Sequence, residues 1–233
     1  MRQSVKRCPV KRRHSAGLSM IELLAGTAIG LLVAAAAAAV VGANVRENRQ
    51  LQLEARLMQE MRSTAGLVAR DLRRAGYWSA SAAGVRGESA SAPAANPHQA
   101  LSPEDAASDA VQLSFSRPAG ADMALDDDER FGFRLRNGVV EVQLGSANWQ
   151  ALSDAGTLRV TAFSVEPFVE EIDLQGFCER DCAVGNTSCP PRQQVRSIAL
   201  SIAARATDDA AVTRSLRSRV RVRNDAVVGS CQE

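Results

Sequence analysis

The chain has 233 residues with 28 basic and 26 acidic side chains, a formal net charge of +2, and room for one membrane segment and one domain of moderate size. Beyond residue 17 the sequence contains no lysine and a single histidine, His98. This composition excludes a P-loop, a Schiff-base lysine and a two-histidine metal motif. The sequence therefore predicts a protein that is not an enzyme and that needs no metal or cofactor.

A basic leader opens the chain, because residues 1–17 contain six positive charges and no acidic residue. From Leu18 to Ala43 the residues are apolar or small, and Glu22 carries the one charge. About 20 apolar residues suffice to span a bilayer as a helix. Positive charges in front of such a segment predict a cytoplasmic N-terminus, a single membrane pass over 18–43 and an exported remainder.

The helix is expected to continue beyond the membrane, because no proline interrupts the sequence from 44 to 76. Arg73 and Arg74 followed by Gly76 form a typical C-terminal stop signal. The stretch 44–76 is therefore predicted to be an amphipathic part of the same helix, packed by one face on a structure outside the membrane. Apolar residues recur along this face at three- or four-residue spacing: Leu57, Met61, Ala65, Val68 and Leu72.

Residues 77–110 are rich in alanine, serine and proline and are interpreted as a long connection that is partly mobile. The remainder, 111–233, is predicted to be a β domain. Its clearest signal is Asn137-Gly138, the preferred pair for a type I′ turn, between two alternating apolar runs. The chain is thus expected to be an α+β protein in which one long helix precedes a mostly antiparallel sheet. Further strands are predicted at 111–116, 157–168, 195–206 and 215–223, with a bulge after Val160.

Four cysteines lie on the exported side, three of them in an irregular loop at 176–192 and the fourth near the C-terminus. An oxidising compartment would allow two disulfides. A zinc site is the alternative, but the spacings fit no common zinc pattern. The pairing stays open among three possibilities. Local bridges between Cys178 and Cys182 or between Cys182 and Cys189 are both allowed, with Cys231 tying the C-terminus to the loop.

Glu22 needs an explanation, because a carboxylate costs roughly 2.5–3.5 kcal/mol at the centre of a membrane helix and less near its end. A cleavable secretory signal would place it in an apolar region where charges are unusual. A plain anchor would tolerate it only as an end residue that reaches water. Cleavage after Gly17 explains it best, because the new amine at Leu18 could pair with Glu22 of a neighbouring chain when such helices pack side by side.

The stretch "GLSMIEL" (17–23) resembles the class III signal of type IV prepilins and type II secretion pseudopilins, in which glycine precedes Phe-Thr-Leu-Ile-Glu-Leu. The resemblance implies that a prepilin peptidase cleaves after Gly17 and methylates Leu18, and that Glu22 guides assembly into a filament. It also implies a type IV pilin-like fold and a place in the bacterial inner membrane, with a periplasmic C-terminal domain. Leu18 replaces the usual phenylalanine, and the proline of major pilins is absent from 34–39, which favours a minor subunit.

The end of the predicted helix extends this resemblance. "LVARDLRRAGYW" (67–78) is similar to the end of the first helix in PilW-type minor pilins and J-type pseudopilins, and "RVRVRN" (219–224) is similar to their last strand. The preferred hypothesis is a PilW-like minor pilin that initiates assembly of a type IV pilus with other minor pilins and the major pilin. The alternatives are a J-type pseudopilin of type II secretion and a DNA-uptake or adhesive subunit at the pilus tip.

Arginines alternate along the last predicted strand and would line one of its faces. A solvated or salt-bridged face is the simplest interpretation, and a contact with a neighbouring subunit is the second. DNA is the least favoured partner, because no aromatic residues interleave with the arginines. The acidic stretch at 126–130 lacks the spacing of a calcium loop and is interpreted as a solvated loop. The four residues of the predicted arginine face are Arg217, Arg219, Arg221 and Arg223.

Overall fold

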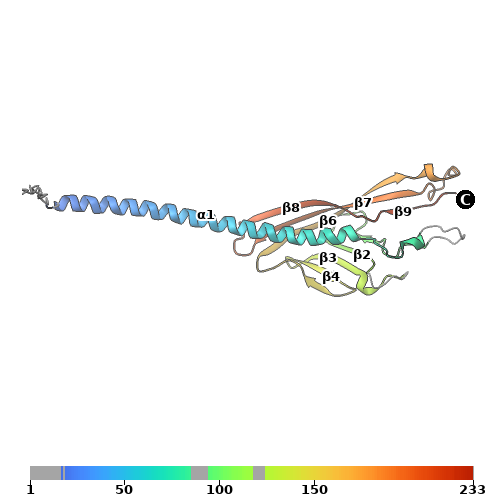
Figure 1. Ribbon diagram of the computed structural model, residues 1–233, viewed down its shortest axis with the longest axis horizontal. Coiled ribbons are helices and arrows are strands. Elements are labelled where there is room, and N and C mark those ends of the chain that lie inside the picture. Colours follow the sequence, from blue (N-terminus) through green and yellow to red (C-terminus); the bar gives the residue numbers. More distant parts are fainter. Residues whose placement is uncertain (1–16, 18, 85–93, 118–123, 233) are drawn as a thin grey trace, which may run out of the picture. The chain divides into compact units, whose positions relative to one another are not determined.

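The computed structural model describes residues 17, 19–84, 94–117 and 124–232 (Figure 1). The chain divides into two compact units between Arg49 and Gln50. Helix α1 spans Met20–Arg74, and the other elements all follow it. Short 3-10 turns occupy Ser81–Gly84, Asp127–Glu129 and Gln175–Phe177. The strands are β1 (Leu101–Ser102), β2 (Ala110–Ser114), β3 (Arg130–Arg136), β4 (Val139–Leu144), β5 (Trp149–Ala151), β6 (Leu158–Asp173), β7 (Arg192–Ala206), β8 (Thr213–Arg221) and β9 (Ala226–Val228).

The first unit contains the N-terminal part of α1, from Met20 to Arg49. The apolar stretch of this helix is long enough to cross a membrane, and residues such as Ile21, Leu31 and Val41 expose more than half of their surface. A helix that is apolar on all sides is suited to lipid rather than to water. The structure thus agrees with a membrane anchor, whereas the orientation across the membrane and the limits of the leader (1–17) and the span (18–43) stay predictions.

In the second unit, α1 continues from Gln50 to Arg74 and buries one face. Every residue of the predicted apolar stripe is buried, and Leu57, Val68 and Leu72 are completely enclosed. Helix packing of this kind stabilises a helix far more than its intrinsic propensity does. The predicted burial of this stripe is therefore confirmed, whereas the bounds 44–76 of the amphipathic part stay a prediction.

The end of α1 is held by the C-terminal part of the chain. The helix ends at Arg74, two residues before the predicted stop at Gly76, which has a φ of +75°, a left-handed conformation that glycine adopts readily. The side-chain amide of Asn224 donates to the carbonyl oxygens of Arg74 (3.4 Å) and Ala75 (3.0 Å). These bonds satisfy carbonyl groups that a helix leaves without a partner at its last turn.

The first sheet is antiparallel and has the strand order β1-β2-β3-β4-β5. β3 and β4 form the predicted hairpin. At its turn Asn137 and Gly138 have φ angles of +54° and +81°, the two positive values that a type I′ turn requires. The predicted hairpin is therefore confirmed.

The second sheet has the order β6-β7-β8, and β9 pairs with the opposite end of β7. The register between β6 and β7 shifts at Val160 and Ala162, which confirms the predicted bulge. Two expectations are corrected, because the strands form two sheets rather than one, and β9 follows the strand that was predicted to be last. β8 ends at Arg221, since the chain then turns so that the backbone N–H of Arg223 donates to the carbonyl oxygen of Arg73 (3.1 Å).

The buried face of α1 shares one hydrophobic core with both sheets. Leu72 of the helix, Phe133 of the first sheet and Leu200 of the second sheet are each at most 1% exposed in this core. A helix with one apolar face and sheets with one apolar face each remove these surfaces from water by packing on one another. The α+β, pilin-like architecture that the sequence predicts is the one observed, with the strands divided between two sheets.

Part of the stretch at 77–110 is buried, and Leu101 belongs to this core, which corrects the interpretation of these residues as a long, partly mobile connection. Trp78, His98 and Leu101 are 5%, 0% and 8% exposed, and β1 lies inside the same stretch. Composition alone missed these residues because small side chains outnumber them. Residues 85–93, within the stretch predicted to be partly mobile, lie outside the described residues.

Candidate functional site

The predicted processing signal lies at the start of α1. Gly17 is exposed, and Leu18 lies outside the described residues. Glu22 is in the first turn of the helix, where a carboxylate interacts favourably with the positive end of the helix dipole. Its side chain is exposed, as are those of all described residues of the first unit. Cleavage at Gly17, methylation of Leu18 and the filament role of Glu22 stay predictions.

Two disulfides brace the segment between β6 and β7. Cys182 joins Cys189 inside the loop, and Cys178 joins Cys231, with Cα–Cα distances of 5.5 and 5.4 Å. This pairing is one of the three that the sequence leaves open. The second bridge fastens the chain after β9 to the loop, and the backbone N–H of Ala183 donates to the side chain of Gln232 next to it (2.8 Å). The loop and the C-terminus therefore form one braced end of the domain.

The structure brings three of the four predicted arginines to one face of β8. Arg219 and Arg221 are exposed there together with Arg217. The Cζ atom of Arg219 lies 4.4 Å from the centre of the Phe168 ring, and Arg221 pairs with Asp225 at 3.1 Å. Arg223 lies beyond the end of the strand and does not extend this row. Arginine on the opposite face behaves differently, because Arg214 forms an ion pair with Glu54 of α1.

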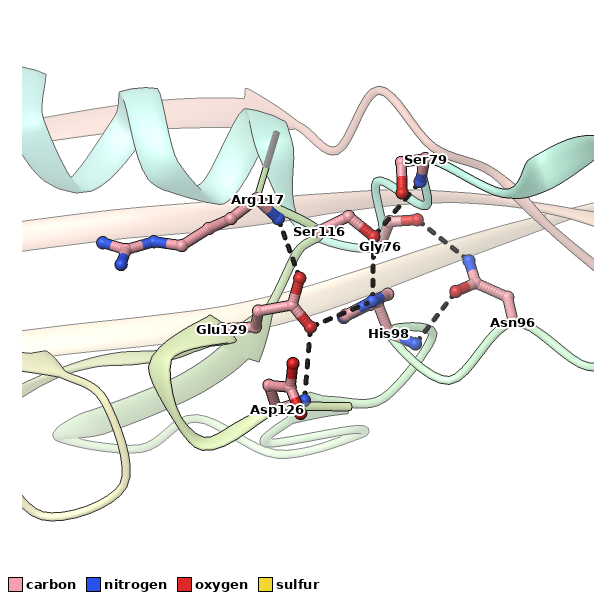
Figure 2. Close-up of polar contacts among 8 residues, drawn as sticks. All are labelled: Gly76, Ser79, Asn96, His98, Ser116, Arg117, Asp126 and Glu129. Atoms are coloured by element: carbon pink, nitrogen blue, oxygen red, sulfur yellow. Dashed lines mark hydrogen bonds and ion pairs between the residues drawn. The ribbon is translucent and has the colours of Figure 1, made fainter. Parts of the chain in front are cut away.

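A buried polar cluster around His98 was not expected from the sequence (Figure 2). The Nε2 atom of His98 lies 3.0 Å from the hydroxyl of Ser116 and 3.6 Å from Oε2 of Glu129. These three residues are at most 2% exposed. The Glu129 carboxylate also accepts the backbone N–H groups of Arg117 (2.8 Å) and Asp126 (3.2 Å). The cluster thus joins the segment before β1 to both flanks of the turn that precedes β3.

Local sequence explains how His98 reaches this position. The side chain of Asn96 accepts the backbone N–H of His98 (2.9 Å) and donates to the carbonyl oxygen of Gly76 (2.9 Å), as Figure 2 shows. Asparagine before proline favours a turn of this kind, so the Asn96-Pro97 pair was the one signal in the sequence. Ser116 completes the link to the end of α1, because its hydroxyl accepts the backbone N–H of Ser79 (3.1 Å).

The geometry of this cluster suits a structural role. In a nucleophile–base–carboxylate triad the two partners bind different nitrogens of the histidine ring. Here the Ser116 hydroxyl and the Glu129 carboxylate both lie against Nε2 of His98. Buried polar groups that satisfy one another in this way fix the position of the segments that carry them. The cluster therefore holds the loops at the C-terminal end of α1 in place.

One protein family describes the part of the chain that contains the buried half of α1, the strands β1 to β8 and the arginine row. Residues 50–222, well over half of the 233, match the family model for prepilin peptidase-dependent protein B. The chain belongs to this family. Comparisons with curated proteins and with solved structures give no match.

Membership makes this a type IV prepilin-related protein, since the family name states a dependence on the prepilin peptidase. The matched residues begin within α1, after the apolar part, and so exclude Gly17, Leu18 and Glu22. The family match and the motif at 17–23 are therefore two separate observations on different parts of the chain.

Proposed function

We propose that this protein is a PilW-like minor pilin that helps to initiate assembly of a type IV pilus. The proposal is carried by the coincidence of the signal "GLSMIEL" at 17–23, in front of an apolar helix, with a prepilin peptidase-dependent family match on 50–222. Within this class, the likeness of residues 67–78 to the end of the first helix of PilW-type minor pilins supports the choice.

Processing is the first step of the proposed mechanism. The prepilin peptidase cleaves after Gly17, and the new amine of Leu18 is methylated. Glu22 then pairs with the amine of a neighbouring subunit, and its exposed place in the first turn of α1 leaves the carboxylate accessible to such a partner. A charge in apolar surroundings is retained mainly when it is paired, and such a pair can fix the register of two helices.

The proposed location is the bacterial inner membrane, with a cytoplasmic N-terminus, one membrane pass and a periplasmic domain that enters the pilus. Two disulfides in the second unit support an oxidising compartment. Contacts with other minor pilins and with the major pilin would then be made by α1 and by the surface of the sheets. The action is non-covalent and structural.

A J-type pseudopilin of a type II secretion system is the second candidate. The observation that favours it is the same stretch 67–78, which is similar to both kinds of subunit. Both candidates share processing at Gly17 and pairing through Glu22, and they differ in the machine that they serve. A test of function must therefore compare pilus activity with protein secretion.

Deletion of the gene followed by complementation provides this test. The deletion is expected to abolish twitching motility and to leave secretion of folded exoproteins intact. The wild-type gene and a Glu47→Ala control restore motility, whereas Glu22→Ala is processed but enters the filament poorly. Gly17→Ala accumulates a precursor 17 residues longer, whereas Gly26→Ala, at a glycine with open space around it, is processed normally.

Lost secretion with intact motility would overturn the pilus role in favour of the pseudopilin. Correctly shortened protein from Gly17→Ala, measured by mass spectrometry of the membrane fraction, would contradict the cleavage site. Normal incorporation of Glu22→Ala into sheared filaments would show that the carboxylate is dispensable.

A further inference from the structure

The outer face of the second sheet presents a different kind of side chain on each of its three long strands. In the central row, Ala199 of β7 lies between Glu166 of β6 and Arg219 of β8. The acid is thus on one flank, the arginine is on the other, and a small residue separates them. In the two neighbouring rows the β7 residue is again small and the β8 residue is again an arginine. One row consists of Ser164, Ser201 and Arg217, and the other of Phe168, Ser197 and Arg221.

This face points away from the core. The alternate residues Val165, Leu200 and Val220 of the same strands are at most 2% exposed, so the rows between them point outward. The small side chains on β7 leave a hollow of about 600 Å³ on this face. The residues that line it include Glu166, Ala199, Ser201, Arg217 and Arg219.

Arg219 is exposed on this face and contacts a ring of the neighbouring row. Its side chain reaches across β7 and stacks on the Phe168 ring, 4.4 Å from the ring centre to Cζ. A guanidinium that stacks on a ring keeps the N–H groups at its edge available to a carboxylate. The side chain of Glu166 is exposed and forms no ion pair with any described residue.

We propose that this face docks against the same face of a second copy of the chain, about a two-fold axis parallel to β7. Such an axis places β6 of each copy opposite β8 of the other, so that Glu166 of each copy meets Arg219 of the other in the same row. An axis perpendicular to the strands would instead set β6 on β6 and β8 on β8, and like charges would repel. The charges therefore select one of the two possible arrangements.

The shape of the face allows this contact. Two sheets that pack face to face lie about 10 Å apart with their strands within about 30° of each other. Alanine and serine along β7 let the two central strands approach, and β8 of each copy then lies directly opposite the acidic β6 of the other. A contact between identical patches closes on itself and gives a dimer. The inference goes beyond the proposed pilin function and does not depend on processing at Gly17.

Charge reversal in the full-length protein tests the proposal. Two differently tagged copies in detergent micelles are mixed, and their association is measured by fluorescence energy transfer over a range of protein concentrations. Glu166→Arg and Arg219→Glu, each alone, are expected to weaken self-association about tenfold or more, because two attractive pairs become repulsive. A mixture of the two variants is expected to associate like the wild type, because both pairs in the mixed dimer again have opposite charges.

Arg136→Glu, at an exposed arginine of the β3–β4 hairpin, is the matched control and should leave association unchanged. Because Glu166 and Arg219 are exposed, both variants should retain the unfolding midpoint of the wild type, and Glu166→Gln offers a milder change with the same direction of effect. Unchanged association of the single variants, or no recovery in the mixture, would overturn the proposal. So would wild-type copies that stay apart while a DNA duplex binds them through Arg219.

Discussion

The two parts of α1 differ in what surrounds them, although they belong to one helix. From Met20 to Arg49 the described side chains are exposed, and the apolar ones lie on all sides. From Leu57 to Leu72 the buried residues recur every three or four positions along one face, and the apolar ones belong to the core of the second unit. In water, a helix is stabilised mainly by the packing of its apolar face on the rest of the protein. In lipid, an apolar helix is stable because its backbone groups bond to one another and its side chains face the lipid. The same secondary structure is therefore stabilised by two different environments.

The largest expected effect on the free energy of unfolding comes from shortening a side chain in the buried part of α1. Leu57→Ala removes a completely buried side chain and should lower the free energy of unfolding by about 2–5 kcal/mol. Leu31→Ala, at a leucine that is 72% exposed, should change it by less than about 0.5 kcal/mol. Denaturant unfolding of the full chain in micelles, followed through the fluorescence of buried Trp78, measures both. Equal losses would break the contrast between the two parts of the helix.

An intermediate effect is expected where the buried part of α1 ends. Asn224→Ala removes the amide that donates to the carbonyl oxygens of Arg74 and Ala75, and should cost about 1–2 kcal/mol. Asn148→Ala, in an exposed turn, is the matched control. The same unfolding measurement applies. A loss no greater than that of the control would show that the carbonyl groups at this helix end find equivalent partners in water.

The smallest expected effect is on the pH dependence of stability and concerns Asp154. Its backbone N–H donates to the Glu60 side chain of α1 (3.1 Å). The hydroxyl of Thr157 and the N–H of Gly156 donate to its carboxylate and hold its pKa below the usual 3.8. Because the pKa is depressed in the folded state, the stabilisation is present above the unfolded-state value and is lost as pH falls through the folded-state value.

The stability difference between the wild type and Asp154→Asn should therefore shrink as pH is lowered below 3.8. Thr157→Ala removes the main cause of the pKa shift and should weaken this pH dependence. Unfolding midpoints measured from neutral to acidic pH provide the test. A difference that stays constant over that range would rule out this contribution to the loop beside α1.

Features of the fold that depend on neighbours in the sequence could be predicted. The stripe that ends at Leu72, the Asn137-Gly138 turn and the bulge after Val160 each follow from spacing or turn chemistry within a few residues. The division of the strands into two sheets could not be predicted in this way. It depends on contacts between segments far apart in the chain, which the local pattern of each strand does not encode.

The same limit applies to the candidate sites. Periodicity correctly put Arg217, Arg219 and Arg221 on one face, but the partner of Arg219 is Phe168 on a strand far away in the sequence. His98 appeared as one polar residue in a stretch of small side chains, and Ser116 and Glu129 reach it only in the folded chain. No short window of sequence contains these pairs.

By itself, the sequence determined the apolar helix, its amphipathic continuation and the hairpin, because these features depend on interactions between residues a few positions apart. It also presents the motif around Gly17 and Glu22, whose use depends on partners outside the chain. Only the tertiary structure decided which cysteines pair, where His98 lies and which charges share the outer face of the second sheet. These outcomes depend on packing and register between distant segments, which are settled when the common core forms.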